Sequence, residues 1–110
     1  MIRRAMWALF AAVLCATAPA LAQDTTGRVA GTVVDSSKAA LPGATIKLEG
    51  GAVNQMAVSD GEGRYAFVAI PPGTYKLTTS LSGFSTAVAE RVEVRLGQTT
   101  PIDVTLSVGG

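Results

Sequence analysis

Histidine is absent from this chain of 110 residues, and cysteine occurs once. Zinc peptidases bind their metal through histidine ligands, and serine hydrolases rely on a histidine base. The one cysteine, Cys15, lies in an apolar N-terminal run that we expect to be removed. Cysteine catalysis would then have no nucleophile. The sequence therefore predicts a protein that is not an enzyme, and it carries no motif for a cofactor.

Charged residues make up 15% of the chain and aromatic residues 5%. Removal of Arg3 and Arg4 with the N-terminal run leaves seven basic and eight acidic residues, scattered without a basic stripe. Proteins that bind nucleic acids or anionic lipids present clustered basic residues, so this pattern argues against both. Frequent Val, Ile and Leu argue against a disordered chain.

The N-terminal 22 residues have the layout of a secretory signal peptide. Two arginines begin it, an apolar run over residues 5–16 follows, and Ala20-Leu21-Ala22 has the small-x-small pattern that signal peptidase accepts. We therefore expect cleavage between Ala22 and Gln23. Residues 1–22 would be the signal peptide, and residues 23–110 would be an exported domain.

Two other interpretations of this segment are less consistent with it. A membrane anchor would have to cross ~30 Å of hydrocarbon, and the apolar run is short for that distance. Lipoprotein processing just before Cys15 would need a small residue at the position that bulky Leu14 occupies. Export to an oxidising compartment is compatible with a mature domain that has no cysteine.

The rest of the chain alternates apolar and polar residues in short runs that turn residues such as Pro42-Gly43 interrupt. This period of two is typical of β-strands with one buried face. Spacings of about 8–12 residues predict an all-β fold, an antiparallel sandwich or small barrel of about seven strands. We predict strands within residues 28–34, 44–49, 53–59, 64–70, 74–81, 84–89, 90–96 and 102–108.

The phase of the alternation also predicts which side chains form the core. Segment 84–89 alternates least regularly, and we take it as the candidate edge strand for a partner strand. The side chains expected to point inward are Val29, Gly31, Val33, Ala44, Ile46, Leu48, Tyr65, Phe67, Tyr75, Leu77, Thr79, Leu81, Val92, Val94, Leu96, Ile102, Val104, Leu106 and Val108.

Three stretches carry a family resemblance: GRVAGTVVDSSKAALPGATIKLEG, SDGEGRYAFVAIPPGTYKLTTSLSGF and VEVRLGQTTPIDVTLSVG. Their most specific parts are Asp60-x-x-Gly63-x-Tyr65-x-Phe67, then Pro72-Gly73-x-Tyr75, then Gly83-Phe84. In this order and spacing they resemble the carboxypeptidase regulatory-like domain over about residues 27–108. The resemblance implies a transthyretin-like (prealbumin-like) seven-stranded sandwich, the accessory domain beside the peptidase and not the peptidase itself. Ser59 stands where the family often has threonine.

Such domains are similar to the N-terminal extension of many TonB-dependent outer-membrane receptors. In those receptors a signal peptide precedes the sandwich, and a plug and a barrel follow it. The resemblance implies a non-catalytic module in a Gram-negative envelope, in the periplasm or associated with the outer membrane, that contacts a protein partner. That partner would be unidentified or a plug and barrel following Gly110; a stand-alone secreted domain is the other possibility.

The segment Asp60-Gly61-Glu62-Gly63 is a candidate calcium site, because calcium prefers oxygen ligands. Its two carboxylates fall far short of an EF-hand pattern. The simpler interpretation is a hairpin turn in which Asp60 accepts hydrogen bonds from the following backbone and the glycines permit positive φ. We predict a turn and no metal site.

An intramolecular isopeptide bond is a second candidate, because related pilin-type sandwiches form one. Such a bond needs a lysine on the first strand and an Asn or Asp on the last. The chain offers Asp103, but Lys47 falls on the second predicted strand and on its polar face. We therefore expect a solvated Lys47 and an outward Asp103.

Carbohydrate binding is the alternative function, because starch-binding-like sandwiches share this architecture. Sugar sites stack their ligand on exposed aromatic rings. Trp7 would leave with the signal peptide, and Tyr65 and Tyr75 share the phase of core residues. We therefore expect both tyrosine rings in the core and Pro71-Pro72-Gly73 as a rigid turn.

Overall fold

The computed structural model describes residues 25–109, and these residues form eight β-strands. None of them forms a helix, so no helix capable of crossing a membrane occurs in this part of the chain. The strands are β1 (Gly27–Asp35), β2 (Thr45–Gly50), β3 (Val53–Val58), β4 (Arg64–Ile70), β5 (Gly73–Ser80), β6 (Ala87–Val94), β7 (Thr99–Pro101) and β8 (Val104–Leu106).

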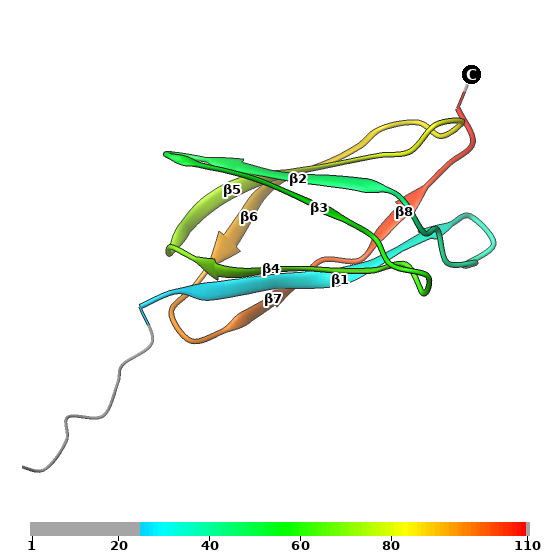
Figure 1. The fold of residues 1–110 in the computed structure, drawn as a ribbon. Coiled ribbons are helices and arrows are strands. Elements are labelled where there is room, and N and C mark those ends of the chain that lie inside the picture. Colours follow the sequence, from blue (N-terminus) through cyan, green and yellow to red (C-terminus); the bar gives the residue numbers. More distant parts are fainter. Residues whose placement is uncertain (1–24, 110) are drawn as a thin grey trace, which may run out of the picture.

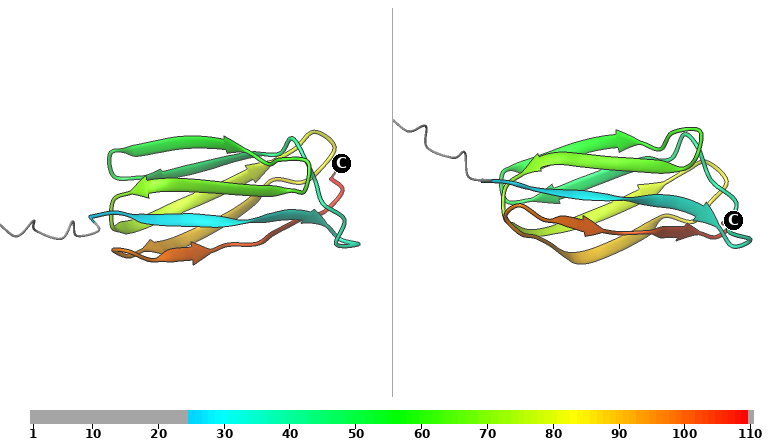
Figure 2. Two further views of the ribbon diagram at one scale, coloured as in Figure 1. Left: turned by 60° about the horizontal axis from the view of Figure 1, so that its bottom comes forward. Right: turned by 90° about the horizontal axis from the view of Figure 1, so that it is seen from below.

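Two sheets lie face to face, which confirms the predicted all-β sandwich (Figures 1 and 2). One sheet has the order β4-β1-β7, with β8 pairing β1 further along, and the other has the order β3-β2-β5-β6. One part of the prediction was wrong: β7 and β8 pair with β1 in parallel, not antiparallel. The chain reaches them only after passing through the opposite sheet, a long crossover that permits parallel pairing.

Strand β6 unites two strands that the sequence analysis separated, at residues 84–89 and 90–96. Its inward-facing residues shift from odd positions, the partly buried Ala87 and Ala89, to even positions, the buried Val92 and Val94. At the shift, Arg91 has φ 60° and the register with β5 is irregular. A β-bulge inserts one extra residue and so reverses the phase of the alternation. The bulge makes one strand resemble two, and β6 does lie at a sheet edge as predicted.

The predicted strand at 102–108 is shorter in the structure, where only Val104–Leu106 forms β8, and the preceding β7 at Thr99–Pro101 was not predicted as a strand. Between them the Ile102 carbonyl turns toward β1, where a Cβ on Gly31 would overlap it. Only glycine at position 31 leaves room for this crossing. Two predicted core residues are exposed, because Leu96 falls in the turn after β6 and Val108 lies beyond β8.

The core between the sheets is built from the inward phase of the strands. It includes both tyrosines, which confirms their predicted burial. Since every buried core residue falls between positions 29 and 106, a chain of residues 23–110 contains all the core packing that the structure describes. The buried residues are Val29, Val33, Ala44, Ile46, Leu48, Tyr65, Phe67, Ile70, Tyr75, Leu77, Val92, Val94, Val104 and Leu106.

Candidate functional site

The segment with the most site-like composition begins at Ser59, between β3 and β4. Because these strands belong to different sheets, the turn crosses the sandwich and is not the β-hairpin loop predicted from the sequence. The Ser59 hydroxyl accepts a hydrogen bond from the Ala44 N–H (2.9 Å) and donates one to the Leu41 carbonyl (2.7 Å). Ser59 is buried with its hydroxyl fully used, so it anchors the turn to the loop before β2.

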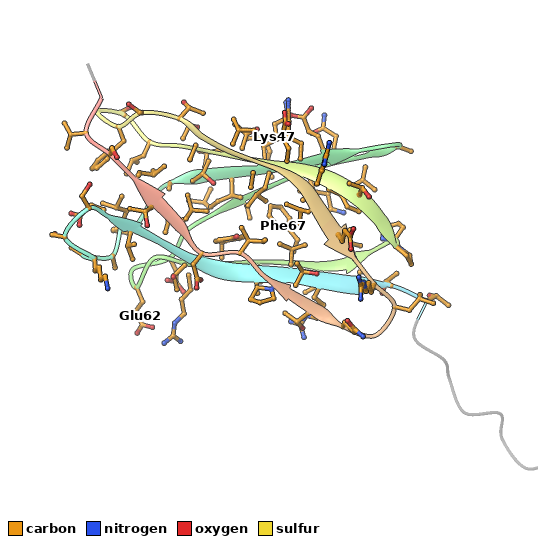
Figure 3. All side chains as sticks on the ribbon, turned by 180° about the vertical axis from the view of Figure 1, so that it is seen from behind. Lys47, Glu62 and Phe67 are labelled. Carbon is orange, nitrogen blue, oxygen red and sulfur yellow. The ribbon has the colours of Figure 1, made fainter. Side chains whose placement is uncertain are left out.

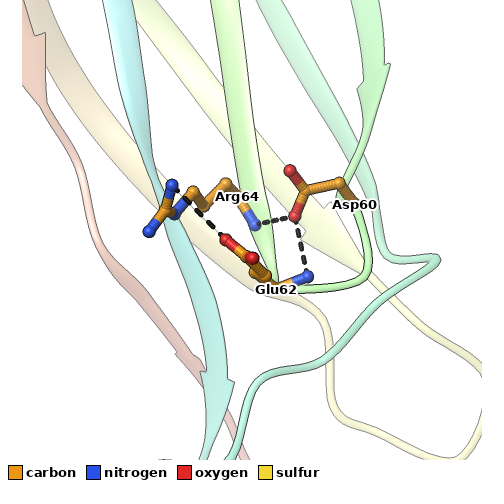
Figure 4. Close-up of polar contacts among 3 residues, drawn as sticks. All are labelled: Asp60, Glu62 and Arg64. Atoms are coloured by element: carbon orange, nitrogen blue, oxygen red, sulfur yellow. Dashed lines mark hydrogen bonds and ion pairs between the residues drawn. The ribbon is translucent and has the colours of Figure 1, made fainter.

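Asp60 holds the turn itself. One of its carboxylate oxygens accepts hydrogen bonds from the backbone N–H groups of Arg64 and Glu62, each at 2.9 Å (Figure 4). The Arg64 bond first, then the Glu62 bond, lowers the pKa of the Asp60 carboxyl below its ordinary value. Gly63 has φ 77°, a conformation that favours glycine. The Asp60 carboxylate therefore has a structural role in shaping this turn.

Glu62, the second acid of the candidate calcium site, projects away from the core (Figure 3). Its carboxylate lies 3.4 Å from the Arg64 guanidinium, so its nearest charged partner is a cation. Among residues 25–109 no group of three or more His, Cys, Asp or Glu side chains is placed to hold a metal ion. The arrangement favours the turn interpretation over calcium.

The two tyrosine hydroxyls each donate a hydrogen bond to a backbone carbonyl. Tyr65 is 5% exposed and bonds the Ile102 carbonyl at 2.5 Å, so it joins β4 to the break between β7 and β8. Burial first, and then the charge of Asp103, raise the pKa of the Tyr65 hydroxyl. Tyr75 bonds the Pro71 carbonyl at 2.5 Å and so braces the turn before β5. Neither ring presents a face for stacking a sugar.

Lys47 and Asp103, the isopeptide candidates, belong to opposite sheets. Lys47 on β2 points away from the core and lies 3.2 Å from Glu49 (Figure 3). The Asp103 carboxylate accepts hydrogen bonds from the Thr32 N–H (3.0 Å) and hydroxyl (3.2 Å). It thereby takes the place of a strand neighbour for Thr32 where β7 ends. These contacts support the predicted solvated Lys47 and exposed Asp103. The predicted cleavage residues Ala22 and Gln23 lie outside the described residues.

Two features of the structure have no counterpart in the sequence analysis. A shallow hollow of about 660 Å³ is lined by β1, β3, β4 and β7, largely by small side chains such as Ala30 and Ala66. A smaller cleft of about 190 Å³ lies between β6 and the β7–β8 segment. Thr79, 1% exposed, lines this cleft, and its hydroxyl has no hydrogen-bond partner among the described residues. The strand phase places Thr79 inside, but it cannot show that the hydroxyl lacks a partner.

Exposed apolar side chains gather on the edges of the sheets. Within residues 25–109, Met56 and Val58 are exposed on β3, Val68 on β4 and Val88 on β6, and each of these is an edge strand. The sequence signal was present in part, because the alternation is weak here: Met56 and Val58 are apolar in one phase, and Val53 and Ala57 in the other.

Comparison with known proteins identifies the family of this fold. Residues 28–107 match the model of the carboxypeptidase regulatory-like domain. No curated protein matches the chain. Among solved structures, the Bacillus anthracis TIE protein has a TM-score of 0.69 and 18% identity over 76% of this chain and 17% of its own.

Two further neighbours differ in their functions. A minor pilin of Streptococcus agalactiae has a TM-score of 0.60 and 13% identity, over 80% of this chain and 47% of its own. A conjectured carbohydrate-binding protein from Bacteroides uniformis has a TM-score of 0.60 and 15% identity, over 72% of this chain and 40% of its own. A dioxygenase and a hydrolase share the fold as well. This chain spans less than half of the first two neighbours, and identities this low establish the fold alone.

Proposed function

This chain belongs to the carboxypeptidase regulatory-like domain family, and on that premise we propose that it is a non-catalytic module that mediates protein contacts in the bacterial envelope. The observation that carries the proposal is the exposure of Met56, Val58, Val68 and Val88 on edge strands. Edge strands offer unpaired backbone groups to another chain, and apolar side chains beside them add contact area.

The groups with potential chemistry support the same function. Asp60 is engaged by backbone N–H groups, and the two tyrosine hydroxyls by backbone carbonyls. A side chain that closes a turn or crosses the core contributes to stability. We therefore expect its replacement to destabilise the fold, and we assign it no catalytic role. We assign the function to the rim of the sheets, where the exposed apolar side chains lie.

The proposed context is export through cleavage between Ala22 and Gln23, followed by residence in the periplasm or at the outer membrane. There the module would precede the plug of a TonB-dependent receptor or act as a stand-alone relative. The signal-like layout of residues 1–22 and the family membership support this context.

Carbohydrate binding is the second candidate, favoured by the Bacteroides uniformis neighbour. The burial of Tyr65 and Tyr75 counts against it, because sugar sites use exposed aromatic faces.

Two measurements on the same protein separate these functions. The tagged full chain is expressed in a Gram-negative host, the cells are fractionated, and the intact mass of the purified protein is measured by mass spectrometry. We expect an envelope protein that begins at Gln23. A glycan-binding screen of residues 23–110 should give no ligand. A cytoplasmic, uncleaved chain would contradict the context, and tight sugar binding that quenches tyrosine fluorescence would favour the second candidate.

A further inference from the structure

Most sheet edges of this sandwich carry features that prevent pairing with another chain. On β6 these are the charges of Glu90, Arg91 and Glu93 and the bulge at Arg91. Proteins use charges, prolines and bulges in this way to keep edge strands from associating. A partner strand laid along β6 would meet these charges and lose register at the bulge.

The edges of the other sheet have comparable features. Strand β4 begins at Arg64, contains Ala69 at φ 56° beside a register shift with β1, and is followed by Pro71. On the far edge, β7 ends in Pro101, which has no N–H to donate, and β7 and β8 are three residues each. Neither edge offers a long, regular row of backbone groups.

Strand β3 has none of these protections. Its sequence, VNQMAV, contains no charged residue, no proline and no glycine. All six of its residues are described, and none has positive φ. Its ladder pairing within residues 25–109 is with β2, over the whole length from Val53 to Val58. Met56 and Val58, at alternate positions on the outer face, are 65% and 63% exposed. This combination is typical of an edge that accepts another strand.

We infer that β3 is the edge at which two copies of this domain associate, by antiparallel pairing of β3 with β3 about a two-fold axis. The pairing would join two four-stranded sheets into one continuous sheet. A two-fold interface brings identical surfaces together, so it requires a strand that does not repel itself. The uncharged β3 meets this requirement.

The charges on the neighbouring strand are most compatible with a register centred on Gln55. In that register Met56 of one copy lies opposite Asn54 of the other, and outward side chains face outward side chains. Behind them on β2, Lys47 pairs with Met56 and Glu49 pairs with Asn54. Each cross-strand row then begins with Lys47 of one copy and ends with Glu49 of the other. A register centred on Met56 would instead place the two Lys47 residues in one row.

This inference rests on the proposed function only in that both assign protein contact to a sheet edge. It concerns the purified domain and does not depend on the compartment. Failure of export or a positive glycan screen would leave it standing, whereas a monomeric domain would overturn it without touching the envelope proposal.

The first test measures association of residues 23–110, which contain the whole described core, by sedimentation over about 10 μM to 1 mM, a range suited to small interfaces. We expect a monomer–dimer equilibrium that Met56→Lys weakens by about tenfold or more, since a charge blocks the edge. Val88→Lys is the matched control, because Val88 is 54% exposed on the outer face of the same sheet at its opposite edge. We expect it to dimerise like wild type.

The second test reads the register. Residues 23–110 contain no cysteine, so in a Gln55→Cys variant any disulfide between two copies must join the two Cys residues at position 55. Directly opposed residues of an antiparallel pair have Cα atoms about 4.5–5.5 Å apart, within the range that a disulfide spans. We expect Gln55→Cys to give a disulfide-linked dimer under mild oxidation, and Val88→Cys to remain largely monomeric. Circular dichroism melts verify that each variant is folded.

Three results would overturn the inference: a folded domain that stays monomeric throughout the range, a dimer that Met56→Lys leaves intact, or cross-linking through position 88 in place of position 55. The last two would assign the interface to another edge.

Discussion

Replacement of Tyr65 by phenylalanine tests whether the family signature is an element of architecture. The change removes one oxygen and keeps the ring, which packs edge to face against Phe67 at a centroid distance of 6.0 Å. It leaves the Ile102 carbonyl, half-buried beneath β1, without the hydrogen bond that Tyr65 donates. An unpaired buried polar group costs about 1–3 kcal/mol. For a domain of this size that is a fall in melting temperature of roughly 4–8 °C for each kcal/mol.

Tyr75→Phe is the matched control. It removes an equivalent hydrogen bond of the same length from a ring of similar burial, but its acceptor belongs to the exposed Pro71, which water can reach. We expect a smaller loss of stability than for Tyr65→Phe. The assay is urea unfolding of residues 23–110 followed by far-UV circular dichroism, with a shared slope for all variants. Equal stability of Tyr65→Phe and wild type, or a larger loss for Tyr75→Phe, would refute the assigned role of Tyr65.

Three further predictions concern single residues. Asp60→Ala should lower the melting temperature by a few degrees equally with and without a chelator, whereas a calcium-dependent loss would restore the metal hypothesis. The folded chain lowers the pKa of Asp60 below its ordinary 3.8, so the stabilisation by its carboxylate is present above that pH and is lost as the pH falls through the folded-state pKa. The difference in melting temperature between wild type and Asp60→Ala should therefore become smaller in acid. A difference that grows in acid would contradict this role of Asp60. Thr79→Val should raise the free energy of unfolding by about 1 kcal/mol, because it removes a buried hydroxyl without a partner at constant volume; destabilisation would show that the hydroxyl is bonded. Gly31→Ala should cost about 2 kcal/mol or more in urea unfolding, because its Cβ would overlap the Ile102 carbonyl; a neutral effect would contradict the tight crossing.

The sequence carries most of the fold because period-two alternation is a direct consequence of one-sided burial. Ile46 and Leu48, or Tyr75 and Leu77, can be placed inside from their spacing alone. The alternation fails where the backbone departs from a regular strand. At Arg91 a positive φ reverses the phase of β6, and no residue type at that position announces it. In the sequence, the bulge can therefore be inferred only from the change of phase in the apolar residues on either side of it.

Features that depend on distant parts of the chain could not be predicted from the sequence. The parallel pairing of β7 with β1 depends on how the chain returns from the opposite sheet, and local patterns do not record that path. The exposure of Leu96 could not be predicted either. Leu96 continues the alternating apolar pattern of Val92 and Val94, but β6 ends at Val94. The tyrosine rings could be placed in the core by phase, but not their carbonyl acceptors.

The candidate site shows a similar division. The turn chemistry of Asp60 follows from residue types, because Asp and Gly at these spacings close turns. That the turn joins two sheets, and that Ser59 links it to the loop before β2, requires the three-dimensional fold. The exposure along β3 was hinted at by Met56 and Val58, but its position at an edge follows only from the strand order.

Residue-resolved amide hydrogen exchange of residues 23–110, at low and at high protein concentration, tests most directly the claim that a sheet edge is the contact surface. If β3 is that edge, exchange of its outward-pointing amides should slow as the concentration rises, while β4 and β6 keep their rates. Exchange on β3 that is independent of concentration, or slowing confined to β6, would contradict the account.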